Sequence, residues 1–272
     1  MTTAAVRKLT VVLVCLLVAL PASAKPRLGA IASAHPLATE AGFEVLAAGG
    51  NACDAAVAVS AALAVVEPAS SGIGGGGFYL IERRGGQTLF VDARETAPQS
   101  ATRDMYLGPD GQPVAQKSLD GPLAAGIPGE PAALVHLVKR CGKLDLARDL
   151  APAIRLASDG FVPDAFHLQM TALRRDALAA SSAAAAIFLD EGAPPKTGFR
   201  LVQKDLAAVL QRLARAGKAG FYEGETARLL IAGVNAGGGA WTADDLKNYR
   251  VVERSPLRGR YRDTDVLTAP PP

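Results

Sequence analysis

The chain has 272 residues, of which 49% are hydrophobic, 20% charged and 5% aromatic, a composition that excludes a wholly disordered protein. Its formal net charge of +3 is too balanced to predict a nucleic-acid partner. With three cysteines, a disulfide-dense scaffold is excluded and the fold has to rest on a packed core.

The first 24 residues have the pattern of a secretory signal peptide. Arg7 and Lys8 precede an apolar run over 11–20, and Pro21-Ala22-Ser23-Ala24 ends it with small residues. A transmembrane anchor needs about 20 apolar residues, roughly twice this run. We therefore expect cleavage after Ala24 and export to the periplasm or the medium. The mature chain, 25–272, is then nearly neutral and has no membrane span.

Export leaves Cys53 and Cys141 in an oxidising compartment, where a disulfide could form. Cys53 lies in an apolar helical run, which favours a buried free thiol instead. Because neither cysteine has a Cys-x-x-Cys partner or a nearby histidine, neither is a good nucleophile or metal ligand.

Two helices are predicted at the start of the mature chain. The first, over 36–48, stops at Gly49, and Asn51 can cap the second, over 52–66, which ends before Pro68. The second helix is apolar almost all round, so we expect it to be buried on more than one side.

A glycine loop and a hairpin follow. The loop, 72–77, comes after Ser70-Ser71 and has five glycines in six positions. It follows a helix and precedes a strand, the reverse of a dinucleotide or phosphate-binding loop, so we interpret it as a place of close backbone approach. Strands over 78–82 and 88–92 flank Gly85-Gly86, a hairpin signal.

After a loose stretch that ends near residue 122, helical patterns resume. Residues 179–186 are alanine-rich, as is typical of a solvated helix end. Gly142, Gly160, Gly217 and Gly237 are plausible helix stops. The predicted helices are 131–140, 146–158, 164–180, 204–216, 226–235 and 243–249, and the predicted strands are 251–254, 257–261 and 265–268.

Few residues are candidates for chemistry. His35, His136 and His167 are not in metal-binding spacings, and structural roles are the better interpretation of each. No Gly-x-Ser-x-Gly elbow is present, which argues against an α/β-hydrolase. Arg94, at the end of an apolar strand near the glycine loop, could hold a substrate carboxylate with two hydrogen bonds. On its own, a surface pair with Asp92 or Glu95 is the more economical interpretation.

Several segments resemble the gamma-glutamyltranspeptidase family in the family's own order. Among them are Ser33-Ala-His-Pro-Leu-Ala-Thr39 and Asp92-Ala-Arg-Glu-Thr-Ala-Pro98. The others are 47–57, 66–78, 126–130, 150–155, 221–225 and the closing Pro270-Pro-Pro272.

This resemblance implies an α/β (α+β) Ntn-hydrolase with an α-β-β-α layered sandwich, incomplete in this chain. Such enzymes are precursors that cut themselves into a large and a small subunit. The new N-terminal threonine of the small subunit attacks the gamma-glutamyl amide of glutathione or a similar donor, with its own α-amine as base. Water or an amino acid then resolves the acyl-enzyme. No metal or organic cofactor is implied.

The resemblance places Arg94 at the arginine that binds the α-carboxylate of the gamma-glutamyl group. Ser70, Ser71 and the loop 72–77 match a family signature that we interpret as architecture, and Cys53 as a packing residue. Residues 25–272 resemble part of a large subunit.

The family continues past the triple proline to the small subunit with its catalytic threonine. Thr96, Thr171 and Thr242 are not in its cleavage motif, so we assign no catalytic residue and expect this chain alone to be inactive. Two alternatives stay open: a non-catalytic relative that binds gamma-glutamyl compounds or a partner, and a cephalosporin-acylase-like member of the family.

Overall fold

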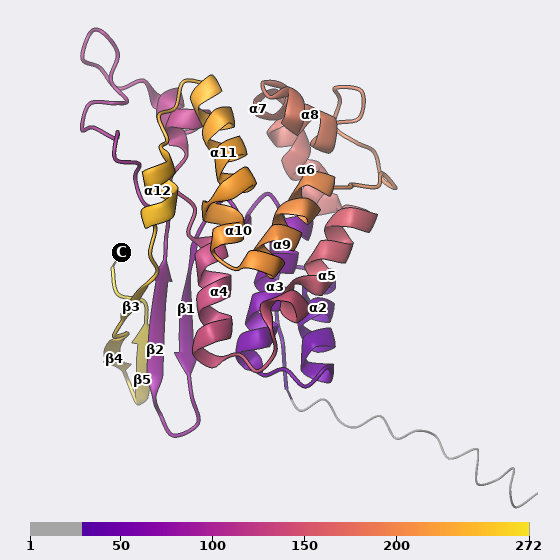
Figure 1. Cartoon of the computed structure of the whole chain (residues 1–272), viewed down its shortest axis with the longest axis vertical. Coiled ribbons are helices and arrows are strands. Elements are labelled where there is room, and N and C mark those ends of the chain that lie inside the picture. Colours follow the sequence, from indigo (N-terminus) through magenta and orange to yellow (C-terminus); the bar gives the residue numbers. More distant parts are fainter. Residues whose placement is uncertain (1–28, 272) are drawn as a thin grey trace, which may run out of the picture. The chain divides into compact units, whose positions relative to one another are not determined.

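The computed structural model describes residues 29–271, so the signal peptide predicted for 1–24 lies outside the described residues. Within the unit formed by Ile31–Pro272, helices cover one face of a small antiparallel sheet (Figure 1). The mixed α and β content agrees with the predicted fold class.

The first two helices form a closely packed pair. The Nδ1 of His35 accepts a hydrogen bond from the Leu37 amide (3.2 Å) at the start of α2 (Pro36–Ala47). Asn51 and Asp54 form a reciprocal capping box at the start of α3 (Ala52–Val66). As expected of a helix that is apolar all round, α3 contacts α2, α4 and α5.

The main sheet has the strand order β1-β2-β3, with antiparallel neighbours. β1 (Gly77–Glu82) and β2 (Thr88–Ala93) form the predicted hairpin. Its turn contains Gly85 and Gly86, both with positive φ (100° and 81°), which a side chain would strain. β3 (Val252–Arg254), from the far end of the chain, pairs with the other edge of β2.

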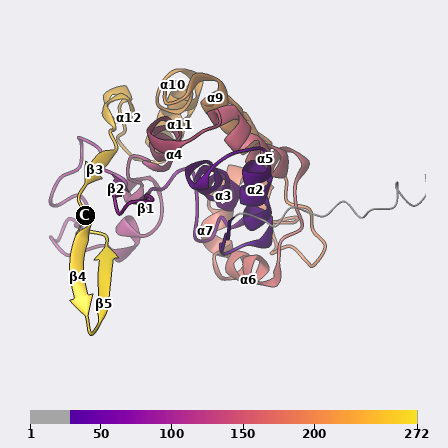
Figure 2. The ribbon, with the colours of Figure 1, turned by 90° about the horizontal axis from the view of Figure 1, so that it is seen from below.

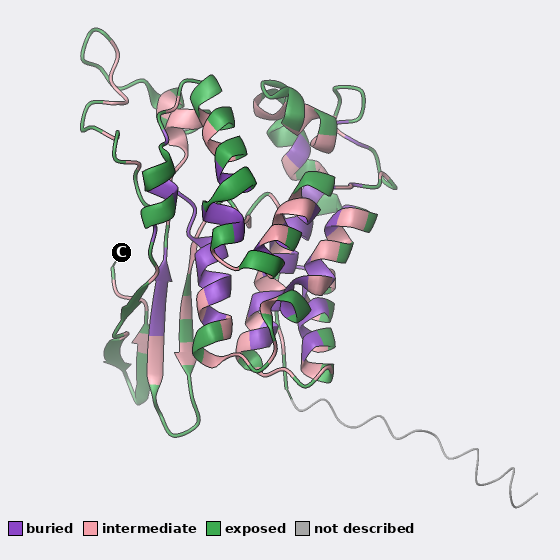
Figure 3. Cartoon of the chain, viewed as in Figure 1, coloured by how far each residue is buried: buried purple, intermediate pink, exposed green. Residues whose placement is uncertain are grey.

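The two faces of this sheet differ. Tyr79, Ile81 and Val91 belong to the helix-covered face and pack against the core. The opposite face, which we call the open sheet face, carries Phe78, Leu80, Phe90, Asp92, Val252 and Arg254. Phe78, Leu80 and Val252 are 39%, 44% and 48% exposed, whereas the central strand β2 is largely buried (Figure 3).

The remaining long helices build the layer behind the sheet, where α5 packs against α3 and α9. The four predicted glycine stops, Gly142, Gly160, Gly217 and Gly237, all lie at helix C-caps. These helices are α4 (Glu130–Cys141), α5 (Leu146–Asp159), α9 (Lys204–Ala216) and α11 (Gly224–Ala236), and the shorter α12 (Ala243–Asn248) precedes β3.

The helix predicted over 164–180 is interrupted. It divides at Arg174 into α6 (Ala165–Leu173) and α7 (Arg175–Ala179). The alanine-rich segment is likewise not a helix end, because the Ser181 hydroxyl accepts from the Ala184 amide and starts α8 (Ser182–Phe188).

Three short helical turns were not predicted. They are η1 (Ala115–Ser118), η2 (Pro122–Ala124) and α10 (Ala219–Tyr222). Each has three or four residues, too few to show a periodic pattern in the sequence.

The expectation of a free thiol at Cys53 is wrong. Cys53 and Cys141 form a disulfide with a Cα–Cα distance of 5.9 Å. Asn51 Nδ2 also donates to the Cys141 carbonyl (2.6 Å). The apolar sequence around Cys53 indicated burial but could not show that the end of α4 reaches the start of α3.

A second hairpin ends the described chain. β4 (Leu257–Tyr261) pairs with β5 (Thr264–Thr268) as a separate two-stranded sheet. It extends away from the helices (Figure 2), and Arg258 Nη2 donates to the Thr88 hydroxyl of β2 (3.0 Å).

Candidate active site

Arg94 lies immediately after β2, where the sheet meets the glycine loop. We call this region, residues 92–95 with the loop 72–77, the Arg94 corner. The main chain of Arg94 is held at both ends: its amide donates to Asp92 Oδ1 (3.1 Å), and its carbonyl accepts from the Tyr249 hydroxyl (2.9 Å). The position of the side chain therefore starts from a fixed backbone.

The Arg94 guanidinium is half exposed and already contacts a carboxylate. Its Nη2 lies 3.0 Å from Glu95 Oε2, and the side chain is 49% exposed. Its Nη1 donates to the Gly76 carbonyl (3.1 Å), and the group lies over the Phe78 ring, 5.9 Å from its centroid. A guanidinium has five N–H donors, more than these two polar contacts use.

Of the two interpretations of Arg94, the surface pair with Glu95 is present. Binding of a substrate carboxylate stays a prediction. An exposed ion pair of this kind contributes about 0–1 kcal/mol. A ligand carboxylate could therefore replace or join Glu95 at little cost.

The glycine loop brings backbone against backbone, as the sequence predicted. A Cβ on Gly76 would lie 2.3 Å from the Ala93 carbonyl oxygen and 3.0 Å from the Arg94 Cα. The Gly75 carbonyl accepts from the amides of Gly129 (2.8 Å) and Glu130 (3.0 Å). The loop is thus fixed between the end of β2 and the start of α4.

A buried polar cluster lies beneath the loop. Glu130 Oε1 accepts from the hydroxyls of Ser60 (2.5 Å) and Tyr79 (2.6 Å), which joins α4, α3 and β1. Burial raises the pKa of the Glu130 carboxyl, and the two hydroxyl donors oppose that shift. Burial also raises the pKa of Tyr79 well above its usual value, so this phenol stays a donor.

Asp92 connects the corner to the third strand. Its Oδ2 lies 2.9 Å from Arg254 Nη2 of β3. With Oδ1 bound to the Arg94 amide, the carboxylate holds both the sheet edge and the corner.

The threonines outside the cleavage motif have structural explanations. Thr96 forms a backbone bridge with Ile127, the Thr171 hydroxyl donates to the His167 carbonyl, and Thr242 caps α12. Among the other predicted signature residues, Ser70 and Ser71 donate through their amides to the Glu67 carbonyl.

The histidines also have structural settings. His35 caps α2, and His136 Nε2 lies 2.9 Å from Glu253 Oε1 of β3. His167 is buried beside the rings of Phe161 and Phe188, and burial lowers the pKa of its imidazole.

Sequence reasoning missed Ser60, Tyr79, Glu130 and Tyr249 as supports of the corner. Glu130 was visible only as the end of the motif 126–130, and Tyr249 only as the end of a predicted helix. Their hydrogen bonds to the corner or to each other span 19 to 155 residues, a separation at which local patterns carry no information.

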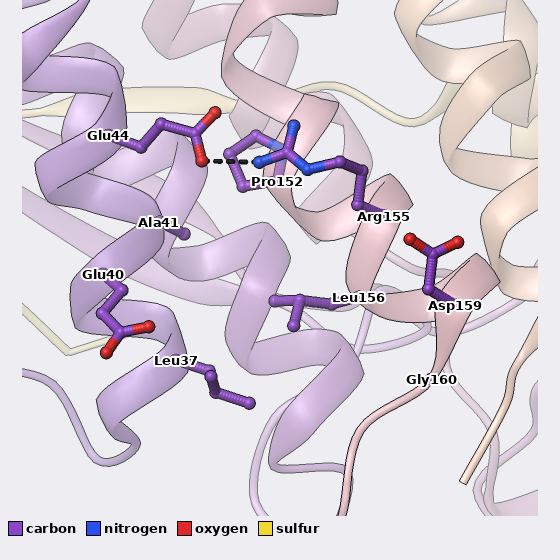
Figure 4. Close-up of a pocket in the computed structure, with 9 residues that line it drawn as sticks. All are labelled: Leu37, Glu40, Ala41, Glu44, Pro152, Arg155, Leu156, Asp159 and Gly160. Carbon is purple, nitrogen blue, oxygen red and sulfur yellow. Dashed lines mark hydrogen bonds and ion pairs between the residues drawn. The ribbon is translucent and has the colours of Figure 1, made fainter. Parts of the chain in front are cut away.

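A pocket of about 290 Å³ lies between α2 and α5, away from the Arg94 corner (Figure 4). Its lining residues are Leu37, Glu40, Ala41, Glu44, Pro152, Arg155, Leu156, Asp159 and Gly160. Arg155 Nη2 donates to Glu44 Oε2 across it (2.5 Å), so its one cationic side chain already has a partner.

Residues 29–271 contain neither a metal-binding cluster nor a membrane-spanning helix. In this range no group of three or more His, Cys, Asp or Glu side chains could hold a metal ion. None of the helices in the same range combines the length and apolar character needed to cross a bilayer.

Comparison with known proteins identifies the family. A family model described as Gamma-glutamyltranspeptidase matches residues 38–272. The chain belongs to the gamma-glutamyltranspeptidase family. Glutathione hydrolase proenzymes of Pseudomonas sp. (strain A14) and Escherichia coli (strain K12) are each 42% identical over 245 residues, 90% of this chain. These residues are 43% and 42% of the two relatives, so the chain spans about two-fifths of their length.

Solved structures support the same family assignment. The gamma-glutamyltranspeptidase of Helicobacter pylori is 39% identical with a TM-score of 0.87, over 89% of this chain and 70% of that one. The cephalosporin acylase of Bacillus halodurans is 31% identical with a TM-score of 0.77, over 87% of this chain and 45% of that one. The fold is therefore the Ntn-hydrolase fold of gamma-glutamyltranspeptidases, of which this chain carries a part.

Proposed function

We propose that this chain is part of a glutathione hydrolase or gamma-glutamyltransferase. In this enzyme, Arg94 binds the α-carboxylate of the gamma-glutamyl donor. The observation that carries the proposal is the half-exposed Arg94 guanidinium, held against the glycine loop and already in contact with a carboxylate. Relatives named glutathione hydrolase proenzyme, 42% identical, support it.

In the proposed reaction, the hydroxyl of an N-terminal threonine attacks the gamma-carbonyl of the donor, and its α-amine accepts the proton. The amide nitrogen takes up a proton and leaves, and water or an amino acid then cleaves the acyl ester and restores the threonine. We place this threonine in the small subunit of the proenzyme, outside residues 1–272.

Arg94 contributes binding and orientation rather than bond making. A planar guanidinium can grip both oxygens of a carboxylate, which fixes the direction of the glutamyl chain. Holding the α-carboxylate there would present the gamma-amide to the nucleophile in one orientation.

Arg94→Lys tests this assignment in the 272-residue chain by ligand-observed NMR. The probes are gamma-glutamyl-p-nitroanilide and gamma-aminobutyryl-p-nitroanilide, which lacks the α-carboxylate. We expect the wild type to prefer the first, and Arg94→Lys to bind it about tenfold more weakly, since an ammonium cannot reproduce the two-point grip. Binding of the second probe should be unaffected.

Arg103→Lys is the matched control, because Arg103 is 97% exposed and lies outside the Arg94 corner. It should leave both affinities unchanged. If Arg94→Lys binds the donor as tightly as the wild type, the assigned role is wrong. In an active enzyme that contains this segment, the same variant should raise the donor KM more than it lowers kcat.

The proposal includes a partner. The rest of the same precursor, including its small subunit, would cover the open sheet face, where Phe78, Leu80 and Val252 are exposed. The proposal also includes export. Residues 1–24 would be a signal peptide and residues 25–272 part of a large-subunit domain. The enzyme would act in the periplasm or outside the cell.

A second candidate is acylase activity within the same family. Acylase ACY 1 proenzyme of Pseudomonas sp. (strain V22) is 38% identical over 90% of this chain. The two candidates differ in the acyl group that they accept. Competition between gamma-glutamyl-p-nitroanilide and an acylated cephalosporin for the Arg94 corner distinguishes them.

A further inference from the structure

Tyr249 joins three segments around the Arg94 corner although it lies 155 residues from Arg94 in sequence. It follows α12 and is 3% exposed. Its hydroxyl donates to the Arg94 carbonyl at 2.9 Å. Burial raises the pKa of this phenol well above its usual value, so the hydroxyl remains a donor at any physiological pH.

The Tyr249 hydroxyl also occupies a space that only a glycine leaves open. A Cβ on Gly129 would lie 2.3 Å from the Tyr249 oxygen and 2.0 Å from the Ala93 carbonyl oxygen. The amide of Gly129 donates to Gly75 of the glycine loop (2.8 Å). The end of β2 and the residue before α4 therefore meet at this hydroxyl, and the glycine loop is joined to them through the Gly129 amide.

The ring and main chain of Tyr249 are fixed as well. The ring stacks on Tyr222, with centroids 5.6 Å apart and an interplanar angle of 8°. The Tyr222 hydroxyl donates to the Pro128 carbonyl (2.7 Å) and accepts from the Ala132 amide (3.2 Å). Lys218 Nζ donates to the Tyr249 carbonyl (2.5 Å).

The position of the Arg94 main chain determines where its half-exposed guanidinium can lie. With the Arg94 amide bound to Asp92, the Tyr249 hydroxyl supplies the second of the two main-chain hydrogen bonds described above. Loss of that bond would allow the peptide after Arg94 to rotate and would move the guanidinium relative to Gly76.

We propose that Tyr249 is a positioning residue that sets the orientation of Arg94 toward the carboxylate of a gamma-glutamyl ligand. This inference rests on the proposed function of Arg94. Tyr249 touches no ligand itself, and it acts through the Arg94 carbonyl.

A double-mutant cycle in the 272-residue chain tests the inference. The variants are Tyr249→Phe, Arg94→Lys and the combination, and the probe is gamma-glutamyl-p-nitroanilide, titrated by ligand-observed NMR. Tyr249→Phe keeps the ring stack and should weaken binding between about twofold and tenfold, the range for one lost hydrogen bond. In the Arg94→Lys background the same change should have no further effect, because non-additivity marks residues that act together.

The Arg94 Nε–Hε signal of an arginine-labelled sample gives a readout that general destabilisation would not move. It should shift in Tyr249→Phe without ligand and respond more weakly to the probe. Tyr106→Phe is the matched control, since it also removes a tyrosine bond to a main-chain carbonyl, that of Leu123. This control should leave both the Arg94 signal and the affinity unchanged.

The outcomes separate this inference from the proposed function. If Arg94→Lys weakens binding but Tyr249→Phe leaves both the affinity and the Arg94 signal unchanged, the inference fails alone. It also fails if the two losses add fully. If the probe never perturbs the Arg94 signal in the wild type, the proposed function fails, and the inference fails with it.

Discussion

At the scale of single residues, burial of the Asp149 carboxyl group lowers the stability of the folded chain. It is fully buried in α5, and neither of its oxygens has a hydrogen-bond partner among the described residues. Burial, and then the neighbouring Asp54 carboxylate, raises its pKa to about 7. Asp54 itself accepts from the amides of Lys143 and Leu144.

This arrangement predicts a stability that falls with pH. Below about pH 4 the carboxyl is protonated in both the folded and the unfolded chain, and there is no penalty. As pH rises toward 7, the unfolded chain ionises while the folded chain stays protonated. The free energy of unfolding should fall by up to roughly 4 kcal/mol over this window and level off above it.

Asp149→Asn should remove most of that dependence, because an amide does not ionise. We expect a higher Tm than the wild type at pH 8 and a small difference at pH 4, measured by thermal unfolding. Asp159→Asn, an exposed aspartate of the same helix, is the control. Equal pH profiles for wild type and Asp149→Asn would contradict this account.

At the scale of elements, the glycine loop shows what a sequence can predict. Its composition indicated close backbone approach, and Gly76 meets that expectation at the Ala93 carbonyl. The sequence did not show which glycine makes the contact, because Gly74 in the same run has open space around its Cβ position. Only the path of β2 distinguishes the two.

Gly76→Ala and Gly74→Ala form a matched pair. We expect Gly76→Ala to destabilise the chain by at least about 2 kcal/mol, since backbone atoms have to move. Gly76→Ala should also weaken the binding of gamma-glutamyl-p-nitroanilide at the Arg94 corner. Gly74→Ala should stay within about 0.5 kcal/mol of the wild type. Chemical denaturation measures both, and equal losses would show that the loop is not held as described.

The disulfide joins two elements whose contact the sequence did not reveal. Helix boundaries followed from capping residues and glycines near each end, which are local signals. The pairing of Cys53 with Cys141 depends on how α3 and α4 pack, as does the buried cluster of Ser60, Tyr79 and Glu130. Local patterns therefore predicted elements well and their supporting contacts poorly.

Removal of this disulfide should be costly. We expect Cys53→Ser with Cys141→Ser to lower the free energy of unfolding by about 2–5 kcal/mol. Non-reducing peptide mapping of the wild type should recover the two cysteines in one linked peptide. Two free thiols in the oxidised, folded protein would support the earlier expectation instead.

At the scale of the whole chain, the open sheet face combines exposed apolar side chains from two strands of the main sheet. Phe78 and Leu80 on β1 and Val252 on β3 are exposed on the same face of the sheet, on either side of β2. An exposed apolar patch of this kind promotes self-association when its partner is absent. In the proposed proenzyme the rest of the precursor covers it.

Leu80→Lys should therefore reduce concentration-dependent association of the 272-residue chain, measured by light scattering. Leu173→Lys is the comparison, because Leu173 is more exposed (74% against 44%) and belongs to α6, a helix that lies away from the sheet (Figure 1). If both variants change association equally, exposure alone matters and the open sheet face has no special role.

The central claim is that Arg94 binds the carboxylate of a gamma-glutamyl ligand. The most direct measurement is a crystal structure of the chain with gamma-glutamyl-p-nitroanilide. We predict the α-carboxylate within about 3 Å of the Arg94 guanidinium nitrogens, with Glu95 displaced or sharing the group and the Tyr249–Arg94 bond intact. A ligand bound elsewhere, with the Arg94–Glu95 pair unchanged, would contradict the account.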